Sequence, residues 1–401
     1  MIDDMSLSLS CRSPAAVSAY NRALDARLHA WTGTEAALDE ALREAPDFAP
    51  AHAMRALQAA MYMRRADVGP AIAAAQTHAS TASERERSQV AVVIEALQGN
   101  ASAALEAALA HLARWPADAL VAGLLLGAYG MLAMSGRLDH NTARLALVRQ
   151  LRPHYPADHA WLTAHLGWAC IEAGELDEGL EHTHRSLALR RANGLMAHVM
   201  MHAHFERNDA AAGLAFIDTW LPIYPEDGMM FGHLHWHAAL CEIDLGRCDA
   251  ALSRLVQQVL RQLDAAPPLG AVADAASLSW RLHLLGHDRL PWDRVVAHAQ
   301  RHFGKGGNVF AEFHLAILAT AQGDRAALDA VSQRLQATAA KGHPAAPVAL
   351  CWTAGLAAVM DGDMHAAQHH LRGCHAEAAR LGGSHAQRTA VDRTIEWLDA
   401  A

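Results

Sequence analysis

The sequence predicts an all-α fold in which antiparallel helix pairs repeat along the chain. Hydrophobic residues make up 52% of the 401 residues and aromatic residues only 5%, a composition typical of closely packed helices. No stretch alternates apolar and polar residues with β-branched enrichment, which is the pattern of a half-buried strand. Turn motifs followed by Ala-rich segments recur at intervals of about 34 to 40 residues, which indicates a repeat array.

The N-terminal part of the chain shows helix-start and helix-stop residues at regular places. Ser13-Pro14 precedes a first helix, Pro46-Asp47 opens a later one, and Gly99-Asn100 ends another, as Pro and Gly do at helix ends. A polar break is expected at 64–69. The expected helices lie at Ala15–Trp31, Thr34–Ala45, Pro46–Met61, Val68–Thr81 and Glu84–Gln98.

Beyond residue 100 the repeat becomes explicit. Trp115-Pro116-Ala117-Asp118 recurs as Tyr155-Pro156-Ala157-Asp158, and each predicts a helix start. A Gly turn followed by Ala-Ala predicts the start of a second helix at Gly246–Ala251, Gly323–Ala327 and Gly362–Ala367. Helix-turn-helix units of this length predict a tetratricopeptide-repeat-like helical solenoid of antiparallel helix pairs.

One helical-repeat domain is expected over residues 1–401, with an N-terminal helical cap at 1–45 and helix-pair repeats over 46–401. Pro267-Pro268 is the best candidate for a break within the array. After the turn at Gly246, an apolar stripe at helical spacing predicts one buried face, formed by Leu252, Leu255, Val256, Val259, Leu260 and Leu263.

Charge and cysteine content narrow the classes of function. A formal net charge of -9 without a local basic cluster argues against nucleic acid as a partner. The six cysteines form no CxxC pair, so reduced buried thiols are expected. No secretory signal and no run of about 18 apolar residues is found, so we expect a cytoplasmic protein without a membrane partner.

Two stripes of imidazoles near the middle of the chain concentrate its chemistry. In a helix, His198, His202 and Glu206 recur at i, i+4 and i+8 on one face. His233 and His237 recur in the same way on a second helix. Imidazole and carboxylate are ligands of Zn, Fe, Mn and Cu, and they are also common proton-transfer groups. A repeat array places first helices side by side, so we expect both stripes to meet in one site.

Two interpretations of these five residues stay open. Buried polar groups must satisfy one another or bind something, so they form either a functional cluster or an inter-helix hydrogen-bond network. His204 and His235 lie about 200° further round their helices and are expected to pack elsewhere or face solvent. Further histidines among polar neighbours are expected at the surface: His182, His184, His287, His298, His302, His365, His369 and His370.

Further polar positions on other helices could complete a site wrapped by the array. Asp274 and Arg281 share one face of a helix expected at 271–285, and His314 lies in an apolar helix expected at 309–321. In the segment Gly382–Arg388, the two glycines are expected to end one helix and Ser384 to cap the start of the next. His385 and Arg388 are expected on one side of the first turns of that helix. A capping or salt-bridge role is the alternative for each of them.

These motifs resemble the tetratricopeptide repeat protein 38-like family over most of the chain, from about Pro46 to the end. The matching pieces are His198-x-x-x-His202-x-x-x-Glu206-Arg207, His233-Leu234-x-Trp236-His237, Asp274-Ala275-Ala276-Ser277-Leu278-x-Trp280-Arg281 and Gly382-Gly383-Ser384-His385-Ala386-Gln387-Arg388. The resemblance implies an all-helical repeat fold and an oxidative tailoring role in bacterial natural-product gene clusters. The extra His204 and His235 depart from the family pattern.

The leading expectation is therefore a metal-dependent small-molecule enzyme of oxidoreductase type in secondary metabolism, acting on a free or carrier-bound substrate. The metal would be Fe, alternatively Cu or Zn, and no nucleotide-cofactor motif is present. The rival is a tetratricopeptide-repeat scaffold that binds a peptide or partner protein. In the leading view the metal ligands are His198, His202, Glu206, His233, His237 and His314, with acid/base roles for His202, Glu206 and His237, and substrate contacts from Asp274, Arg281, His385 and Arg388.

Overall fold

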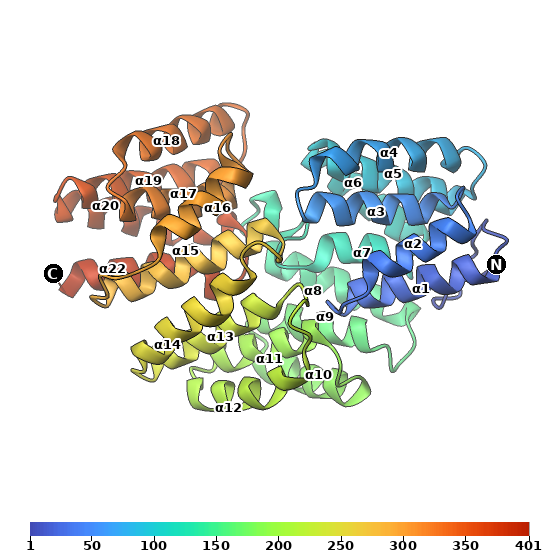
Figure 1. The fold of residues 1–401 in the computed structure, drawn as a ribbon, viewed down its shortest axis with the longest axis horizontal. Coiled ribbons are helices and arrows are strands. Elements are labelled where there is room, and N and C mark those ends of the chain that lie inside the picture. The colour runs from blue at the N-terminus through green and yellow to red at the C-terminus, as the bar shows by residue number, and fades with distance from the viewer. Residues whose placement is uncertain (401) are drawn as a thin grey trace. The chain divides into compact units, whose positions relative to one another are not determined.

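The computed structural model describes residues 1–400, and most of these lie in helices (Figure 1). Within this range no β-strand forms, and the bridge between Ile2 and Ser8 is isolated. The predicted all-α class is thus confirmed. The chain divides into two compact units, unit 1 with residues 1–132, 141–199 and 223–229, and unit 2 with residues 133–140, 200–222 and 230–401.

Unit 1 is built of helices that pack as neighbours along the sequence, α1 against α2, α3 against α4, α5 against α6 and α9 against α10. Gly167 shows how close such a pair lies, because a Cβ there would meet Thr183 Oγ1 at 2.8 Å. The helices are α1 Pro14–Leu28, α2 Thr34–Glu44, α3 Ala49–Met61, α4 Arg65–Ala79, α5 Glu84–Gln98, α6 Ala101–Arg114, α7 Ala119–Leu126, α8 His140–Leu151, α9 Ala160–Glu172 and α10 Leu176–Leu189. The boundary between the units falls within α11, Gly194–Glu206.

In unit 2, helices α13, α15, α17 and α19 contact one another in succession, and each also packs against the helix that follows it. Within unit 2, as within unit 1, helices that follow one another in sequence pack as pairs. The helices are α12 Ala210–Trp220, α13 Phe231–Asp244, α14 Cys248–Arg254, α15 Pro268–Leu284, α16 Trp292–Phe303, α17 Val309–Ala321, α18 Arg325–Ala340, α19 Ala346–Met360, α20 Met364–His375, α21 His385–Arg388 and α22 Ala390–Ala400.

The C-terminal segment of unit 2 folds back on its own helix array. A short 3-10 helix, η6 (Ala378–Leu381), contacts α17 and α19, and α21 contacts α15. The last helix, α22, packs against α15 and α20. This return brings the Gly-Gly-Ser-His motif of the sequence onto the face formed by the first helices of successive pairs.

The Gly turns predicted between paired helices are present. Gly246, Gly323 and Gly362 have φ values of 72°, 64° and 75°, so each adopts the left-handed conformation that ends a helix and that a Cβ disfavours. The second helix of each pair, α14, α18 or α20, begins two residues later in each case. No helix among residues 1–400 combines the length and apolar character needed to cross a membrane.

Three sequence-based expectations are wrong. The polar break at 64–69 is shorter than expected, because α4 already begins at Arg65 and contains Pro70 within it. The helix after Gly246 does not keep one buried face: a π-helical segment at Leu255–Val259 shifts the register, and Val256 is exposed. His298, expected at the surface, is buried and its Nδ1 donates to Asp264 Oδ1 at 2.9 Å.

Candidate functional site

The two predicted imidazole stripes meet in one cluster. His202 on α11 and His237 on α13 have ring centroids 4.6 Å apart, and His233 lies 4.8 Å from His237. His198 is one turn before His202 on α11 and completes the group. Each of the four rings offers one nitrogen, and these four nitrogens all lie within 4.8 Å of one another. We call these residues the four-His cluster.

The cluster is shielded from solvent on most sides. His202 is 0% exposed, His198 and His237 are also buried, and the His233 side chain is 15% exposed. Tryptophan rings cover two members: Trp236 stacks on His233 at 5.3 Å, and Trp168 lies 5.5 Å from His198. Solvent therefore has its best access to the cluster at His233.

Local sequence signals set the length and position of α11. Asn193 caps its start by accepting a hydrogen bond from the Met196 backbone N–H at 3.1 Å. Asn208, with φ of 53°, turns the chain after Glu206, and the next residue caps α12. Glu206 is consequently the last residue of α11, two turns beyond His198 on the same face.

Asp274 on α15 lies behind the cluster and not in it. His233 Nδ1 donates to both carboxylate oxygens of Asp274 at 2.9 Å, and Asp274 is 3% exposed. This bond places a proton on Nδ1, so Nε2 is the nitrogen of His233 through which the ring could bind a metal ion. A carboxylate behind a histidine in this way is the usual support of a metal-ligating imidazole.

The other polar residues of the same α15 face hold α13 and α21. Ser277 Oγ accepts from the Trp236 indole N–H at 3.1 Å. Arg281 donates to the Ala386 carbonyl at 2.8 Å and Thr389 Oγ1 at 3.0 Å, and its guanidinium lies 5.8 Å from the Trp236 ring centre. Burial lowers the pKa of Arg281 to about 10. Arg281, expected to contact substrate, is placed as a brace between helices.

Glu206 is not part of the four-His cluster but pairs with His385. His385 Nδ1 donates to Glu206 Oε1 at 2.7 Å, across 179 residues of sequence. The sequence suggested both residues for the site, with Glu206 as a metal ligand and catalytic group and His385 as a substrate contact. The structure brings them together as a carboxylate–imidazole pair.

Arg388 and His314 also have local structural contacts. Arg388 donates to the carbonyls of Gly382 and Gly383 at 3.2 and 2.9 Å and so fixes the loop before α21. His314, expected as a metal ligand, lies outside the four-His cluster, and its Nδ1 donates to the Phe310 carbonyl at 2.8 Å. Burial lowers the pKa of His314 to about 4, so this ring is neutral at neutral pH.

His204 and His235 do not belong to the four-His cluster, as their positions on the helices predict. His235 Nδ1 accepts from Arg254 at 3.2 Å, and its ring packs 4.6 Å from Phe231. His204 lies 6.3 Å from the Phe216 ring on α12. Both serve packing between helices.

The four-His cluster has nearly the dimensions of a metal site. An ion that binds nitrogen at about 2.1 Å can hold ligand atoms at most about 4.2 Å apart. The observed limit of 4.8 Å is close enough for small side-chain rotations to bring the ring nitrogens to one ion. Neutral imidazoles suit Zn, Cu and Fe, and Asp274 supplies one negative charge behind them.

A second group with metal-like composition is better explained by an ion pair. Cys170, Glu175 and Glu178 offer ligand atoms within 4.8 Å of one another in unit 1. Arg149, however, donates to Glu175 at 3.3 Å and to Glu178 at 2.9 Å, so both carboxylates already share a guanidinium partner. Burial raises the pKa of Cys170 to about 12, so its thiolate, the form that binds metals, is disfavoured.

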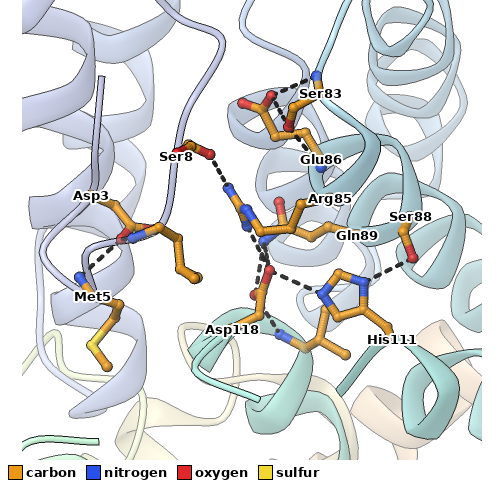
Figure 2. A network of polar contacts seen from close by, with 12 residues as sticks. Asp3, Met5, Ser8, Ser83, Arg85, Glu86, Ser88, Gln89, His111 and Asp118 are labelled. Atoms are coloured by element: carbon orange, nitrogen blue, oxygen red, sulfur yellow. Dashed lines mark hydrogen bonds and ion pairs between the residues drawn. The ribbon is translucent and has the colours of Figure 1, made fainter. Parts of the chain in front are cut away.

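Unit 1 contains a buried polar network that the sequence patterns did not predict (Figure 2). Asp118 accepts from Arg85 at 2.6 Å, from Gln89 at 2.9 Å and from His111 Nε2 at 3.1 Å, and His111 Nδ1 lies 2.9 Å from Ser88 Oγ. Burial alone would raise the pKa of Asp118, but the His111 bond and the charge of Arg85 outweigh it and lower the pKa below 3.8. The motif around Asp118 signalled a helix cap, not this network.

The same network ties the N-terminal residues to α5. Arg85 also donates to the Ser8 carbonyl at 3.2 Å, and Glu86 accepts from the Ser10 backbone N–H at 3.0 Å (Figure 2 shows Arg85, Ser8 and Glu86). Glu86 and Ser83 form a capping box at the start of α5. Each charged group of this network has a partner within the chain, which favours a structural role for the network.

No protein-family model matches the chain. The resemblance to the tetratricopeptide repeat protein 38-like family, drawn from the motifs quoted above, therefore stays a prediction.

Proposed function

We propose that the chain is a metal-dependent enzyme that acts on a small molecule at the four-His cluster, within a tetratricopeptide-like helical solenoid. The observation that carries the proposal is the approach of four ring nitrogens, three of them from buried residues, to within 4.8 Å. Clustering several imidazoles is unfavourable once they are protonated, and a bound cation turns the same arrangement into a stable one.

The ligand set bears on which metal is bound. Iron was favoured from the sequence because His and carboxylate ligands were expected together. In the structure Glu206 pairs with His385 and Asp274 pairs with His233, which leaves imidazole nitrogens facing one another. Imidazole ligands suit copper and zinc as well as iron, so the three metals are equal candidates. Copper or iron would supply the redox chemistry that oxidative tailoring requires.

The return of the C-terminal segment favours an enzyme over a peptide-binding scaffold. A scaffold of this class would bind its peptide along the face formed by the first helices of successive pairs. In unit 2, η6 and α21 already contact α15, α17 and α19 on this array. Arg281 fastens α21 there through the Ala386 carbonyl at 2.8 Å. The chain's own segment takes contacts that a peptide would otherwise make.

Metal analysis of matched variants tests the proposal. Purified protein, loaded with Fe(II), Cu(II) or Zn(II) and desalted, should retain one equivalent of metal by elemental analysis. His202→Ala and His237→Ala should each abolish retention, and the double variant should lose little more, because ligands of one ion act as a unit. His235→Ala, on the same helix as His237 but outside the cluster, is the control. Equal metal retention in all variants would contradict a metal centre at this place.

A further inference from the structure

We propose that Cys351 and Cys374 are a redox modification site, at which a peroxide joins α19 to α20 through a reversible disulfide. Cys351 lies in the N-terminal half of α19, and Cys374 lies in the last turn of α20. Both are reduced in this structure. The inference goes beyond the function proposed above and does not depend on the metal centre.

The packing of α19 against α20 places the two cysteines at the same level of one helix pair (Figure 1). Cys351 precedes the turn residue Gly362 by 11 residues, and Cys374 follows it by 12. Positions equally far from the turn lie opposite one another in an antiparallel pair. The two helices also approach closely, because a Cβ at Gly355 would meet Leu371 Cδ2 at 2.6 Å.

Contacts of the side chains bring the two thiols together. A Cβ at Gly373, next to Cys374 in sequence, would lie 3.6 Å from Cys351 Sγ. Cys351 Sγ donates to the carbonyl of His370, one turn before Cys374 on α20, at 2.9 Å. The two thiols are also in hydrogen-bonding contact with each other. From such a contact, rotation of the side chains can bring the sulfur atoms to the disulfide bond length of about 2.05 Å.

Exposure gives the two thiols different roles. Cys351 is partly exposed, whereas Cys374 is 2% exposed. An oxidant in the solvent therefore meets Cys351 first, and Cys374 is the resolving thiol. Burial raises the pKa of both thiols, so each is mostly protonated at neutral pH and the first step is slow.

With a peroxide as oxidant, the reaction has two steps. Cys351 Sγ attacks one peroxide oxygen, the O–O bond breaks, and the departing oxygen leaves as water with the thiol proton, which makes Cys351 a sulfenic acid. Cys374 Sγ then attacks that sulfur, the S–S bond forms, the S–O bond breaks, and a second water carries away the Cys374 proton. The two thiols lose two electrons in total, and hydrogen peroxide is reduced to two waters.

Peptide mapping after treatment with hydrogen peroxide tests the site. Trypsin cleaves between the two cysteines at Arg372, which leaves Cys351 in the peptide 342–372 and Cys374 in the peptide 373–380. Oxidised protein, blocked with iodoacetamide before digestion, should yield these two peptides joined and two hydrogen atoms lighter than their sum. Dithiothreitol should separate them. If the joined peptides do not form, or if other cysteines are linked instead, the proposal is overturned.

Serine variants test the role of each thiol. In Cys374→Ser the sulfenic acid has no resolving partner, so dimedone should label Cys351. In Cys351→Ser, dimedone should leave the buried Cys374 unlabelled. Cys248→Ser is the matched control, because it removes another partly exposed thiol, at the start of α14, and should form the link as wild type does. Labelling of Cys374 but not Cys351 would contradict the assigned order of attack.

A comparison with unfolded protein shows whether the fold directs the link. Wild type oxidised in urea should give mixed disulfides among its six cysteines, because the unfolded chain no longer holds this pair together. The joined peptides at equal yield from folded and unfolded protein would overturn the proposal. This comparison uses wild type alone, so it decides the question even if a serine variant does not fold.

Discussion

Replacing Asp274 with Asn tests whether the carboxylate behind His233 supports a metal ligand. Both Asp274 oxygens accept from His233 Nδ1 at 2.9 Å, and the carboxylate is 3% exposed. Asn removes the negative charge and can also turn its N–H groups toward the ring, which would favour the proton on Nε2 and block it as a ligand. A buried charge-assisted bond is worth about 1.5–3 kcal/mol, so the metal affinity should fall about 10- to 100-fold.

Competition with a chromogenic chelator for Zn(II) measures that loss directly. Asp264→Asn is the matched control, because Asp264 accepts from His298 Nδ1 at the same 2.9 Å, outside the four-His cluster. The zinc dissociation constant should rise for Asp274→Asn and stay at the wild-type value for Asp264→Asn. An unchanged constant in a folded Asp274→Asn protein would refute the view that this carboxylate acts through a metal ligand.

Three further predictions concern stability. Asp118→Ala should lower the free energy of unfolding in urea by about 3–5 kcal/mol, because it leaves a buried guanidinium without its counter-charge. The pKa of Asp118 is lowered from 3.8, so the ionised carboxylate stabilises the wild-type fold above pH 3.8, and this stabilisation is lost as the pH falls through the lowered pKa. In Asp118→Ala the free energy of unfolding should lack this loss at low pH. Burial lowers the pKa of His314 from 6.5 to about 4, so between these two pH values the unfolded state binds a proton that the folded state does not. The free energy of unfolding should therefore decrease as the pH is lowered from 6.5 to about 4, and it should decrease less in His314→Phe. Gly383→Ala should destabilise the protein by more than Gly362→Ala, because both have positive φ but only at Gly383 does the new Cβ meet an aromatic ring.

Periodic features of the fold could be predicted from the sequence. Helix pairing and the turns at Gly246, Gly323 and Gly362 follow from local rules, since only glycine adopts the required φ without strain. The approach of His202 and His237 was also predicted, because a spacing of four residues places the histidines of each helix on one face, and in the structure these two rings lie 4.6 Å apart. These are properties of short segments and of their regular stacking.

The partners of individual polar side chains could not be predicted in the same way. Asp274 and Arg281 share one face of α15, yet Asp274 supports His233 while Arg281 braces α21. Which neighbour each side chain meets depends on how α13, α15 and α21 are rotated and offset, and that is set by packing of the whole unit. Glu206 shows the same limit, because its partner His385 lies 179 residues away on a segment that returns to the array.

The two buried polar sets of this chain differ in the kinds of side chain that they contain. In the Asp118 network, a carboxylate meets a guanidinium, an amide and an imidazole, so charges of both signs are matched within the chain. The four-His cluster consists of one kind of side chain, and the carboxylate of Asp274 accepts a hydrogen bond from Nδ1 of one of its members, His233. Four ring nitrogens within 4.8 Å of one another could hold a metal ion, and the carboxylate bonded to His233 would offset part of the charge of that ion. Imidazoles brought together repel one another once two of them take up protons, and this repulsion favours the metal centre proposed above over a network that only joins helices.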